Sequence, residues 1–274
     1  MRDRFLRLVI AATGMLAFSP EIVAQNAPQP SAAGAQAAVT TPDISGVWTG
    51  PLGGGGGGGN TGQGGVGRRR WTEANPPLQP WAAAILRANR EGVDDPNEQG
   101  LDSRDPNNNC IPPGMPRVYA VGRPFEIVQS PGRVHILFEW DHTVRRIFTD
   151  GRKHPEGYYL TYMGWSIGSW DRDTLVVDTV GLHEKTWLDG IGTPHSDALR
   201  VIERVRRLDR ENLEIDFRFE DPKAFTRPWG AKKVYRWTPQ WEVLEHINCE
   251  DHLMEEHLPE HLKNLKDLLR GINP

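Results

Sequence analysis

The sequence predicts a mainly β fold, an antiparallel up-and-down meander. From residue 124 onward, short apolar runs alternate with turn signals rich in Gly, Pro, Asp and Asn. Residues 213–220 alternate strictly between apolar and polar side chains, as a strand with one buried face does. Because roughly nine such strands fall in one domain, a closed, lipocalin-like barrel is the favoured architecture. A two-sheet sandwich is the alternative.

The chain begins with the pattern of a secretory signal peptide. Arginines among the first residues form a positive segment, an apolar run follows over residues 8–18, and small or apolar residues precede a cleavage site near Ala24. The apolar run is shorter than the ~20 residues that a transmembrane helix needs, and no other stretch is long and apolar enough. We therefore expect residues 1–24 to be removed and the mature protein to be periplasmic or secreted.

Two low-complexity segments surround the first predicted strand. Residues 25–43 are rich in Ala, Pro and Gln and are expected to be a disordered lead-in. The strand covers residues 44–50, and the almost pure glycine run over residues 53–67 is predicted to be a flexible insertion. The chain over residues 44–274 is predicted to be a single β-rich domain.

A short helix and a long loop precede the meander. Apolar residues at helical spacing predict the helix over Leu78–Asn89, and the polar, Pro/Asn-rich loop covers Asp94–Pro116. The loop at 181–198 joins two strands and is predicted to lie at a mouth of the barrel. An amphipathic helix is predicted over Asp251–Arg270. The strands of the meander are predicted over residues 125–129, 134–140, 143–149, 158–170, 174–180, 199–208, 213–219 and 232–238, with 243–247 following.

Composition indicates the compartment and excludes some partners. Cys110 and Cys249 are the two cysteines, and in an oxidising compartment such a pair most often forms one structural disulfide. Closing a loop of that length contributes ~4 kcal/mol in the chain-entropy account. Two free thiols or a catalytic cysteine are the alternatives. The net charge of −4 and the pI near 6.1 give no indication of binding to nucleic acid or to an anionic membrane.

Two motifs imitate those of known enzyme classes. Residues 164–168 match the G-x-S-x-G nucleophile elbow, which requires a strand, a sharp turn and then a helix. Here a turn and another strand follow, so Ser166 is predicted to be a wall residue of the barrel. His257 and His261 match the H-x-x-E-H pattern of zinc proteases. Because Pro259 lies inside this motif and little chain follows it, a polar helix face is the favoured interpretation.

The predicted active site is centred on the loop at 181–198. Long ordered loops at a barrel opening often carry function, and this loop holds acids, bases and an aromatic side chain. His195 is predicted to be the catalytic acid or base. Glu203 shares a strand face with Val201 and Val205, so it is predicted to be a buried carboxylate that orients or activates His195.

Three further residues, His154, Tyr162 and Asp189, are predicted to be supporting polar groups of this site. The predicted activity is proton transfer on a small, partly apolar molecule or sugar derivative within the barrel, as in a lyase, an isomerase or a hydrolase. The competing interpretation of Glu203 is structural, as a Glu–Arg ion pair that joins strands. Neutralisation of Glu203 by Arg204 or Arg206 would favour a non-catalytic binding protein.

Two other function classes use the same part of the chain. A non-catalytic binding protein would hold a hydrophobic ligand in the barrel. A metalloprotein would use His154, His183 and His195 with a carboxylate to hold Zn²⁺ or another divalent metal. No organic cofactor is predicted, and the expected partner is a small-molecule ligand or substrate.

Several short blocks stand out along the chain. They are SGVW at 45–48, CIPPGMPR at 110–117, PFEI at 124–127, DGRKHP at 150–155, the hairpin segment 162–179, PHS at 194–196 and ER at 203–204. As a set, extending over most of residues 44–250, they resemble a family of secreted bacterial proteins with no firmly assigned activity. The resemblance implies secretion and suggests that the glycine run is an insertion particular to this chain.

Overall fold

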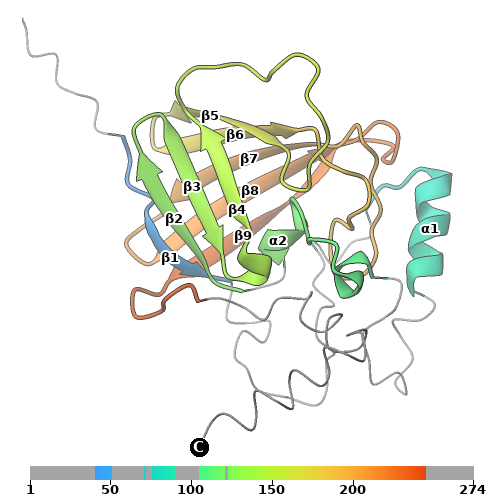
Figure 1. Cartoon of the computed structure of the whole chain (residues 1–274), viewed down its shortest axis with the longest axis horizontal. Coiled ribbons are helices and arrows are strands. Elements are labelled where there is room, and N and C mark those ends of the chain that lie inside the picture. The colour runs from blue at the N-terminus through green and yellow to red at the C-terminus, as the bar shows by residue number, and fades with distance from the viewer. Residues whose placement is uncertain (1–40, 51–70, 72–75, 91–104, 121–122, 245–274) are drawn as a thin grey trace, which may run out of the picture. The chain divides into compact units, whose positions relative to one another are not determined.

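The protein is a closed barrel of nine β-strands, described here from a computed structural model (Figure 1). The structure describes residues 41–50, 71, 76–90, 105–120 and 123–244. The predicted lipocalin-like barrel is confirmed, and the alternative sandwich is wrong because strands β1 and β9 pair and close the sheet. The strands are β1 (Gly46–Thr49), β2 (Phe125–Ser130), β3 (Arg133–Phe138), β4 (Val144–Phe148), β5 (Trp165–Asp171), β6 (Thr174–Val180), β7 (Arg200–Arg207), β8 (Asn212–Glu220) and β9 (Trp229–Trp237).

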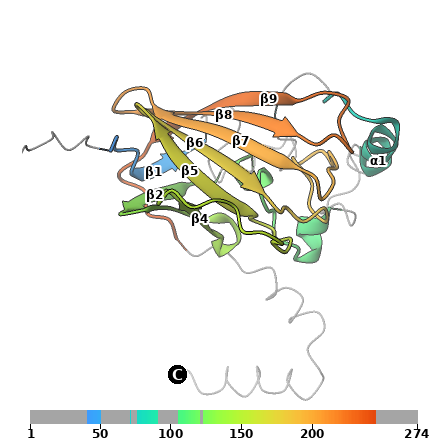
Figure 2. The ribbon, with the colours of Figure 1, turned by 90° about the horizontal axis from the view of Figure 1, so that it is seen from above.

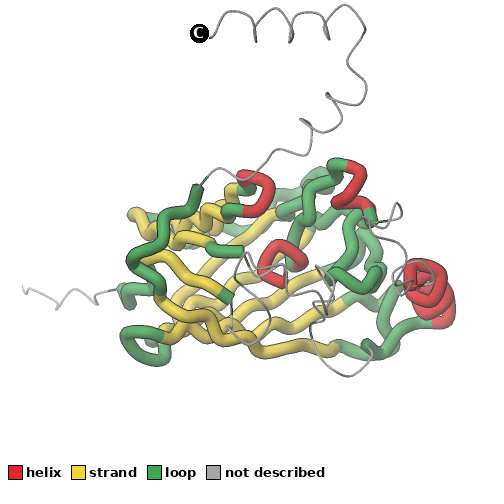
Figure 3. Tube along the Cα trace, turned by 90° about the horizontal axis from the view of Figure 1, so that it is seen from below, coloured by secondary structure: helices red, strands yellow, loops and turns green. Residues whose placement is uncertain are grey.

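Helices are short and lie outside the strand order. Helix α1 covers Pro80–Arg90, close to its predicted range, and α2 is a single turn at Arg117–Ala120. Two 3₁₀ turns, η1 (Pro106–Asn109) and η2 (Trp140–His142), complete the described helical elements. Figure 2 shows α1 at one end of the barrel, beside the ends of β7, β8 and β9. Figure 3 shows loop segments between α1 and the strand ends.

One strand pair departs from the predicted antiparallel meander. Every neighbouring pair is antiparallel except β4 and β5, which run parallel through Ile147–Ser166 and Phe148–Ile167. A closed ring with an odd number of strands cannot alternate in direction throughout, so at least one pair must be parallel. The chain between β4 and β5 therefore returns along the barrel before β5 begins.

This return explains why the strand predicted over residues 158–170 begins only at Trp165. Gly164 has a φ of 66°, in the left-handed region that favours glycine. A Cβ at this position would lie 2.7 Å from the Val180 carbonyl oxygen. The backbone therefore turns here, where it passes close to β6, and a regular strand cannot extend through it.

Side chains fill the inside of the barrel. On β8 the predicted alternation places Leu213, Ile215, Phe217 and Phe219 inward, all buried. The α2 turn adds Tyr119, whose ring lies 4.9 to 5.4 Å from the rings of three phenylalanines of the wall. The other large buried side chains include Trp48, Tyr235, Ile127, Ile136, Ile147 and Leu175. The strands thus enclose a packed core, held by apolar burial.

Some predictions fall outside the described residues. These are the signal peptide, the lead-in up to residue 40, the glycine run at 53–67, Cys249, the motif at His257 and His261, and the helix at 251–270. The strand predicted at 243–247 does not start where expected, since Val243 and Leu244 have no strand structure and the rest lies outside the described ranges. No helix within the described ranges has the length and apolar character needed to cross a membrane.

Candidate functional site

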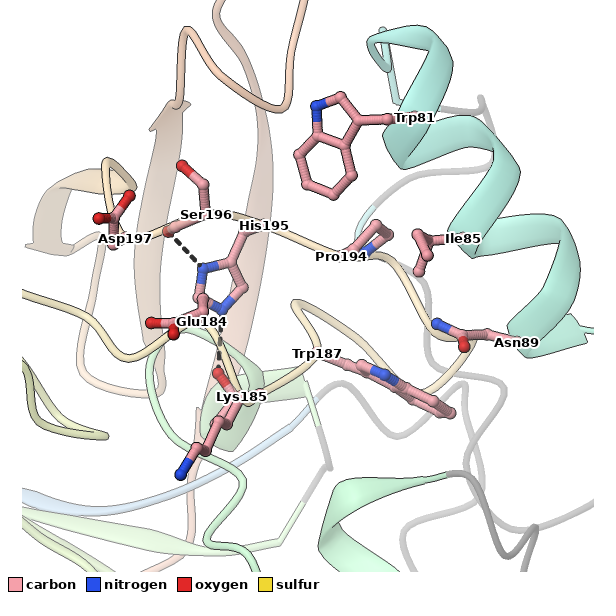
Figure 4. A pocket seen from close by; sticks show the side chains of 11 residues that line it. Trp81, Ile85, Asn89, Glu184, Lys185, Trp187, Pro194, His195, Ser196 and Asp197 are labelled. Carbon is pink, nitrogen blue, oxygen red and sulfur yellow. Dashed lines mark hydrogen bonds between the residues drawn. The ribbon is translucent and has the colours of Figure 1, made fainter.

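A cleft of about 440 Å³ opens at the end of the barrel where α1 lies. One wall is α1, and the other is the loop between β6 and β7, predicted above to lie at a barrel mouth (Figure 4). The lining residues are Trp81, Ile85, Asn89, Glu184, Lys185, Thr186, Trp187, Pro194, His195, Ser196 and Asp197. This cleft lies outside the barrel, whose interior holds a packed core, whereas the sequence predicted a substrate pocket within the barrel.

The amphipathic pattern of α1 fixes this wall of the cleft. Ala82 and Leu86, four residues apart, share the buried face of the helix. Trp81 and Ile85 are 45% exposed and, with Asn89, point toward the loop (Figure 4). The indole Nε1 of Trp81 donates to the Lys223 carbonyl at 2.8 Å, and the Asn89 amide donates to the Gly192 carbonyl at 2.8 Å. These two bonds attach the helix to the barrel end.

His195 is held at the cleft wall by hydrogen bonds on both ring nitrogens (Figure 4). Its Nδ1 lies 3.0 Å from the Ser196 carbonyl oxygen, which can only accept, so Nδ1 carries a proton. Its Nε2 lies 2.9 Å from Thr186 Oγ1. Burial lowers the pKa of His195, because the charged ring loses hydration. The neutral ring therefore presents the Nε2 lone pair to the Thr186 hydroxyl.

A buried carboxylate, Asp221, fixes the residue that holds His195. Asp221 Oδ2 accepts from the Ser196 amide at 2.7 Å, and Oδ1 accepts from the Ser196 hydroxyl at 2.7 Å. The backbone amides of Lys223 and Ala224 also donate to Oδ1, each at 3.1 Å. The Ser196 carbonyl is thereby anchored to the turn that follows β8. Asp221 and Glu184 each favour the charged ring electrostatically, whereas the neighbouring His183 opposes it.

The predicted pair of His195 and Glu203 does not form. Glu203 is buried as predicted, but both of its oxygens accept hydrogen bonds from Arg145 of β4 inside the barrel. The structural alternative is therefore correct in kind, with a different arginine. Arg204 and Arg206 point outward instead and face the carboxylates of the β5–β6 turn.

Arg145 uses its remaining donors on neutral groups of the barrel wall. Its Nη1 lies 2.9 Å from the Tyr119 hydroxyl, and its Nη2 lies 2.9 Å from Thr179 Oγ1. Its Nε lies 3.2 Å from Ser166 Oγ. Ser166 is thus a wall residue, as the hairpin pattern predicted, and its hydroxyl is also bonded to Arg145. Every donor of the guanidinium is satisfied, which a charge in a packed core requires.

The other predicted site residues are distributed over separate structures. His154 Nε2 lies 3.3 Å from Oδ2 of Asp178 on β6, and Arg200 of β7 binds the same carboxylate. Asp189 is buried and accepts a hydrogen bond from the Thr193 hydroxyl at 2.8 Å. It also accepts from the backbone amides of Ile191 and Thr193, so it stabilises the conformation of the loop. Burial raises the pKa of Asp189, with these hydrogen bonds opposing the shift.

Two predicted residues lie near the cleft without lining it. Tyr162 stacks on His183, with ring centroids 5.5 Å apart. The His183 carbonyl lies 3.3 Å from Thr186 Oγ1, and its ring lies 3.3 Å from the Glu184 carboxylate. Within the described ranges, no group of three or more His, Cys, Asp or Glu side chains could hold a metal ion, so the three histidines predicted as ligands do not form a metal site.

Sequence reasoning missed two functional candidates, Thr186 and Asp221. Thr186 lies nine positions before His195, and Asp221 follows β8, 25 positions after Ser196. The sequence indicates one feature of Asp221, since an Asp followed by Pro after a strand predicts a turn stabilised by the carboxylate. Its bond to Ser196 has no sequence signal.

Fold and site together define a lipocalin-like barrel whose cleft is built by its mouth loop and an added helix. The histidine of this cleft is neutral, buried and bonded on both nitrogens. Comparison of the chain with protein-family models, curated proteins and solved structures finds no match. The resemblance to a secreted family therefore stays a prediction.

Proposed function

We propose that the protein is an enzyme in which His195 transfers a proton to or from a small, partly apolar molecule bound in the cleft. The observation that carries the proposal is the state of His195. Its ring is neutral, its Nδ1 proton is fixed on the Ser196 carbonyl, and its Nε2 is the unprotonated, basic nitrogen that faces the Thr186 hydroxyl. A general base needs this combination of an available lone pair and a fixed ring.

The cleft has the composition of a small-molecule site. Its volume falls in the range of about 300–1,000 Å³ that is usual for such sites. Trp81, Ile85 and Trp187 supply apolar surface, while Asn89 and Glu184 supply polar groups that could orient a ligand. The reaction class is a proton-transfer reaction, as in a lyase, an isomerase or a hydrolase.

Replacement of His195 tests the proposal. Purified protein is screened against esters, lactones and sugar derivatives, and His195→Gln is compared with the wild type on any substrate found. We expect a loss of at least about 100-fold in kcat, the usual contribution of general acid–base catalysis. The matched control is His142→Gln, since His142 is an exposed histidine on η2 that does not line the cleft. Undiminished turnover in His195→Gln contradicts the proposal.

A second candidate function is a non-catalytic binding protein for a hydrophobic ligand. The specific observation in its favour is the exposure of Trp81 and Ile85 on the cleft side of α1, where a ligand would cover them. Such a protein would bind its ligand equally well after His195→Gln, and Trp81→Ala would weaken binding. Titration followed by tryptophan fluorescence separates the two candidates.

We further propose that the protein works outside the cytoplasm, in the periplasm or as a secreted protein. The supporting observations are the signal-peptide pattern of residues 1–24 and the cysteine pair of the sequence. Determining the N-terminus of protein recovered from the exported fraction tests this, with cleavage expected near Ala24.

A further inference from the structure

We infer that Thr186 is the nucleophile of this site and that the substrate class is a carboxylic ester with an apolar acyl part. The inference rests on the proposed function, because it requires His195 to be the base. It adds the identity of the nucleophile, the covalent bond that this nucleophile forms with the acyl carbon, and the class of substrate that carries the acyl group.

The geometry is that of an activated hydroxyl. Thr186 Oγ1 lies 2.9 Å from His195 Nε2, within the 2.6–3.2 Å range typical of a nucleophile and its base. The base is oriented in turn, since Nδ1 donates to the Ser196 carbonyl and Asp221 fixes Ser196 through two bonds of 2.7 Å. Nucleophile, base and orienting group thus form one connected series, the arrangement by which such catalytic sets are identified on unrelated folds.

The side chain of Thr186 has little freedom to leave this position. Gly114 lies against it, and a Cβ on Gly114 would approach the Thr186 methyl carbon to 3.1 Å and the Tyr162 carbonyl oxygen to 2.8 Å. Thr186 is also β-branched, so its first side-chain torsion is restricted intrinsically. Among the described residues, the His183 carbonyl oxygen competes for this hydroxyl at 3.3 Å, and it is farther away than His195 Nε2.

The surroundings of the pair indicate the substrate class. Both residues line the cleft but are almost completely buried, at 3% exposure each, so only a flat, narrow group can reach Oγ1. A carbonyl carbon at the end of an apolar chain meets this requirement. Trp81, Ile85 and Trp187 offer a surface for that chain on the same cleft.

The reaction then proceeds in two balanced steps. Thr186 Oγ1 attacks the acyl carbon, its proton passes to His195 Nε2, and His195 returns that proton to the alcohol oxygen as the ester bond breaks. Water next attacks the threonyl ester, gives a proton to His195 and releases the acid, while Thr186 Oγ1 regains its proton. The positive ring formed in each step lies near the carboxylates of Asp221 and Glu184, which favour it.

The test uses p-nitrophenyl esters and a fluorophosphonate probe on the full-length protein. Thr186→Val keeps the shape of the side chain and removes the hydroxyl, whereas Thr186→Ser keeps the hydroxyl. We expect Thr186→Val to lose ester hydrolysis by at least 1,000-fold, Thr186→Ser to retain it within about tenfold, and the probe to label the peptide that contains Thr186. Thr193→Val is the control, because it removes a buried, hydrogen-bonded hydroxyl from the same loop. Thermal unfolding of this variant shows how much stability the loss of such a hydroxyl costs.

The outcomes separate this inference from the proposed function. If His195→Gln abolishes turnover while Thr186→Val retains it and no adduct forms on Thr186, the inference is overturned and His195 remains the base. Wild-type protein that neither hydrolyses any ester nor takes the probe also overturns it. Labelling of Thr186 that depends on His195 supports both proposals.

Discussion

Arg145 and Glu203 form an ion pair inside a packed barrel, where a charge without a partner is most costly. Their side chains are 1% and 0% exposed. Desolvating two ions costs several kcal/mol each, and the surrounding hydroxyls of Tyr119, Ser166 and Thr179 offset part of this cost. The position of the pair is thus set by three partners, which lie on α2, β5 and β6.

We predict that loss of one member of this pair is much more harmful than loss of both. Glu203→Gln should lower the free energy of unfolding by about 3–5 kcal/mol, because Arg145 keeps its charge without a counter-ion. Arg145→Met combined with Glu203→Leu should cost less than the sum of the single changes. Denaturant unfolding measures both. Arg200→Ala, which breaks an exposed pair with Asp178, should cost about 1 kcal/mol or less.

His195 should make the stability of the protein sensitive to mild acid. Its pKa is lowered in the fold, so the folded chain binds this proton less readily than the unfolded chain, whose histidine has a pKa near 6.5. The contribution of His195 to the free energy of unfolding is therefore constant above pH 6.5. Stability falls as the pH drops below that value, by up to about 1.4 kcal/mol per pH unit, until the folded pKa is passed.

The measurement is unfolding free energy between pH 7.5 and 5 for the wild type and for His195→Gln. We expect the difference in acid sensitivity to begin near pH 6.5, with His142→Gln following the wild type. The proposed base role adds that kcat/KM declines on the acid side with a midpoint below 6.5. A midpoint well above 6.5 would contradict the neutral, buried ring.

At the scale of elements, the cleft depends on a close approach of α1 to the mouth loop. Gly192 has a φ of 89°, and a Cβ there would lie 2.5 Å from the Cβ of Asn89. We predict that Gly192→Ala displaces α1 from the loop, lowers stability by about 1–3 kcal/mol and impairs ligand binding. Limited proteolysis within α1 should become faster.

Gly151→Ala is the matched control for this change. Gly151 has a similar φ of 80°, but a Cβ there would meet nothing within 4 Å. It therefore carries the same backbone strain without the contact to α1. Equal proteolysis of α1 in both variants would show that helix displacement is not the consequence of filling position 192.

Elements were predictable where their side-chain pattern is local. The strand predicted over residues 174–180 has the same bounds in the structure, and the inward face of β8 follows from its alternation. The parallel β4–β5 pair was not predicted, because an odd number of strands in a closed ring requires a parallel pair but does not indicate which neighbours form it. Even Glu203, correctly predicted to be buried, gave no indication of Arg145, which lies 58 positions away.

The site was predictable only in part for the same reason. The mouth loop and His195 follow from sequence, since a long polar loop between strands must lie at a barrel end. The second wall of the cleft does not, because α1 reaches it through contacts with residues 103 and 142 positions away. Spatial partners at such separations leave no periodic signal in one sequence.

At the scale of the whole molecule, export and the cysteine pair make a joint prediction. If the mature protein reaches an oxidising compartment, Cys110 and Cys249 should be joined, and reduction should lower stability by about 4 kcal/mol. Peptide mapping without reductant detects the linked peptides, and Cys110→Ser should remove the effect of reductant on unfolding. Recovery of both cysteines as alkylated thiols from exported protein would refute it.

The parallel pair also divides the barrel. Strands β4 and β5 share two partner pairs, as do β1 and β9, whereas β7 and β8 share eight. The closed barrel therefore has two narrow seams, one between β4 and β5 and one between β9 and β1, where the fewest residues pair. Arg145 of β4 extends across the β4–β5 seam to Ser166, Thr179 and Glu203, which lie on β5, β6 and β7. Among the strand amides, those along these two seams should exchange with solvent first. The hydrogen bonds of the Arg145 guanidinium hold β4 to the strands on the other side of the β4–β5 seam.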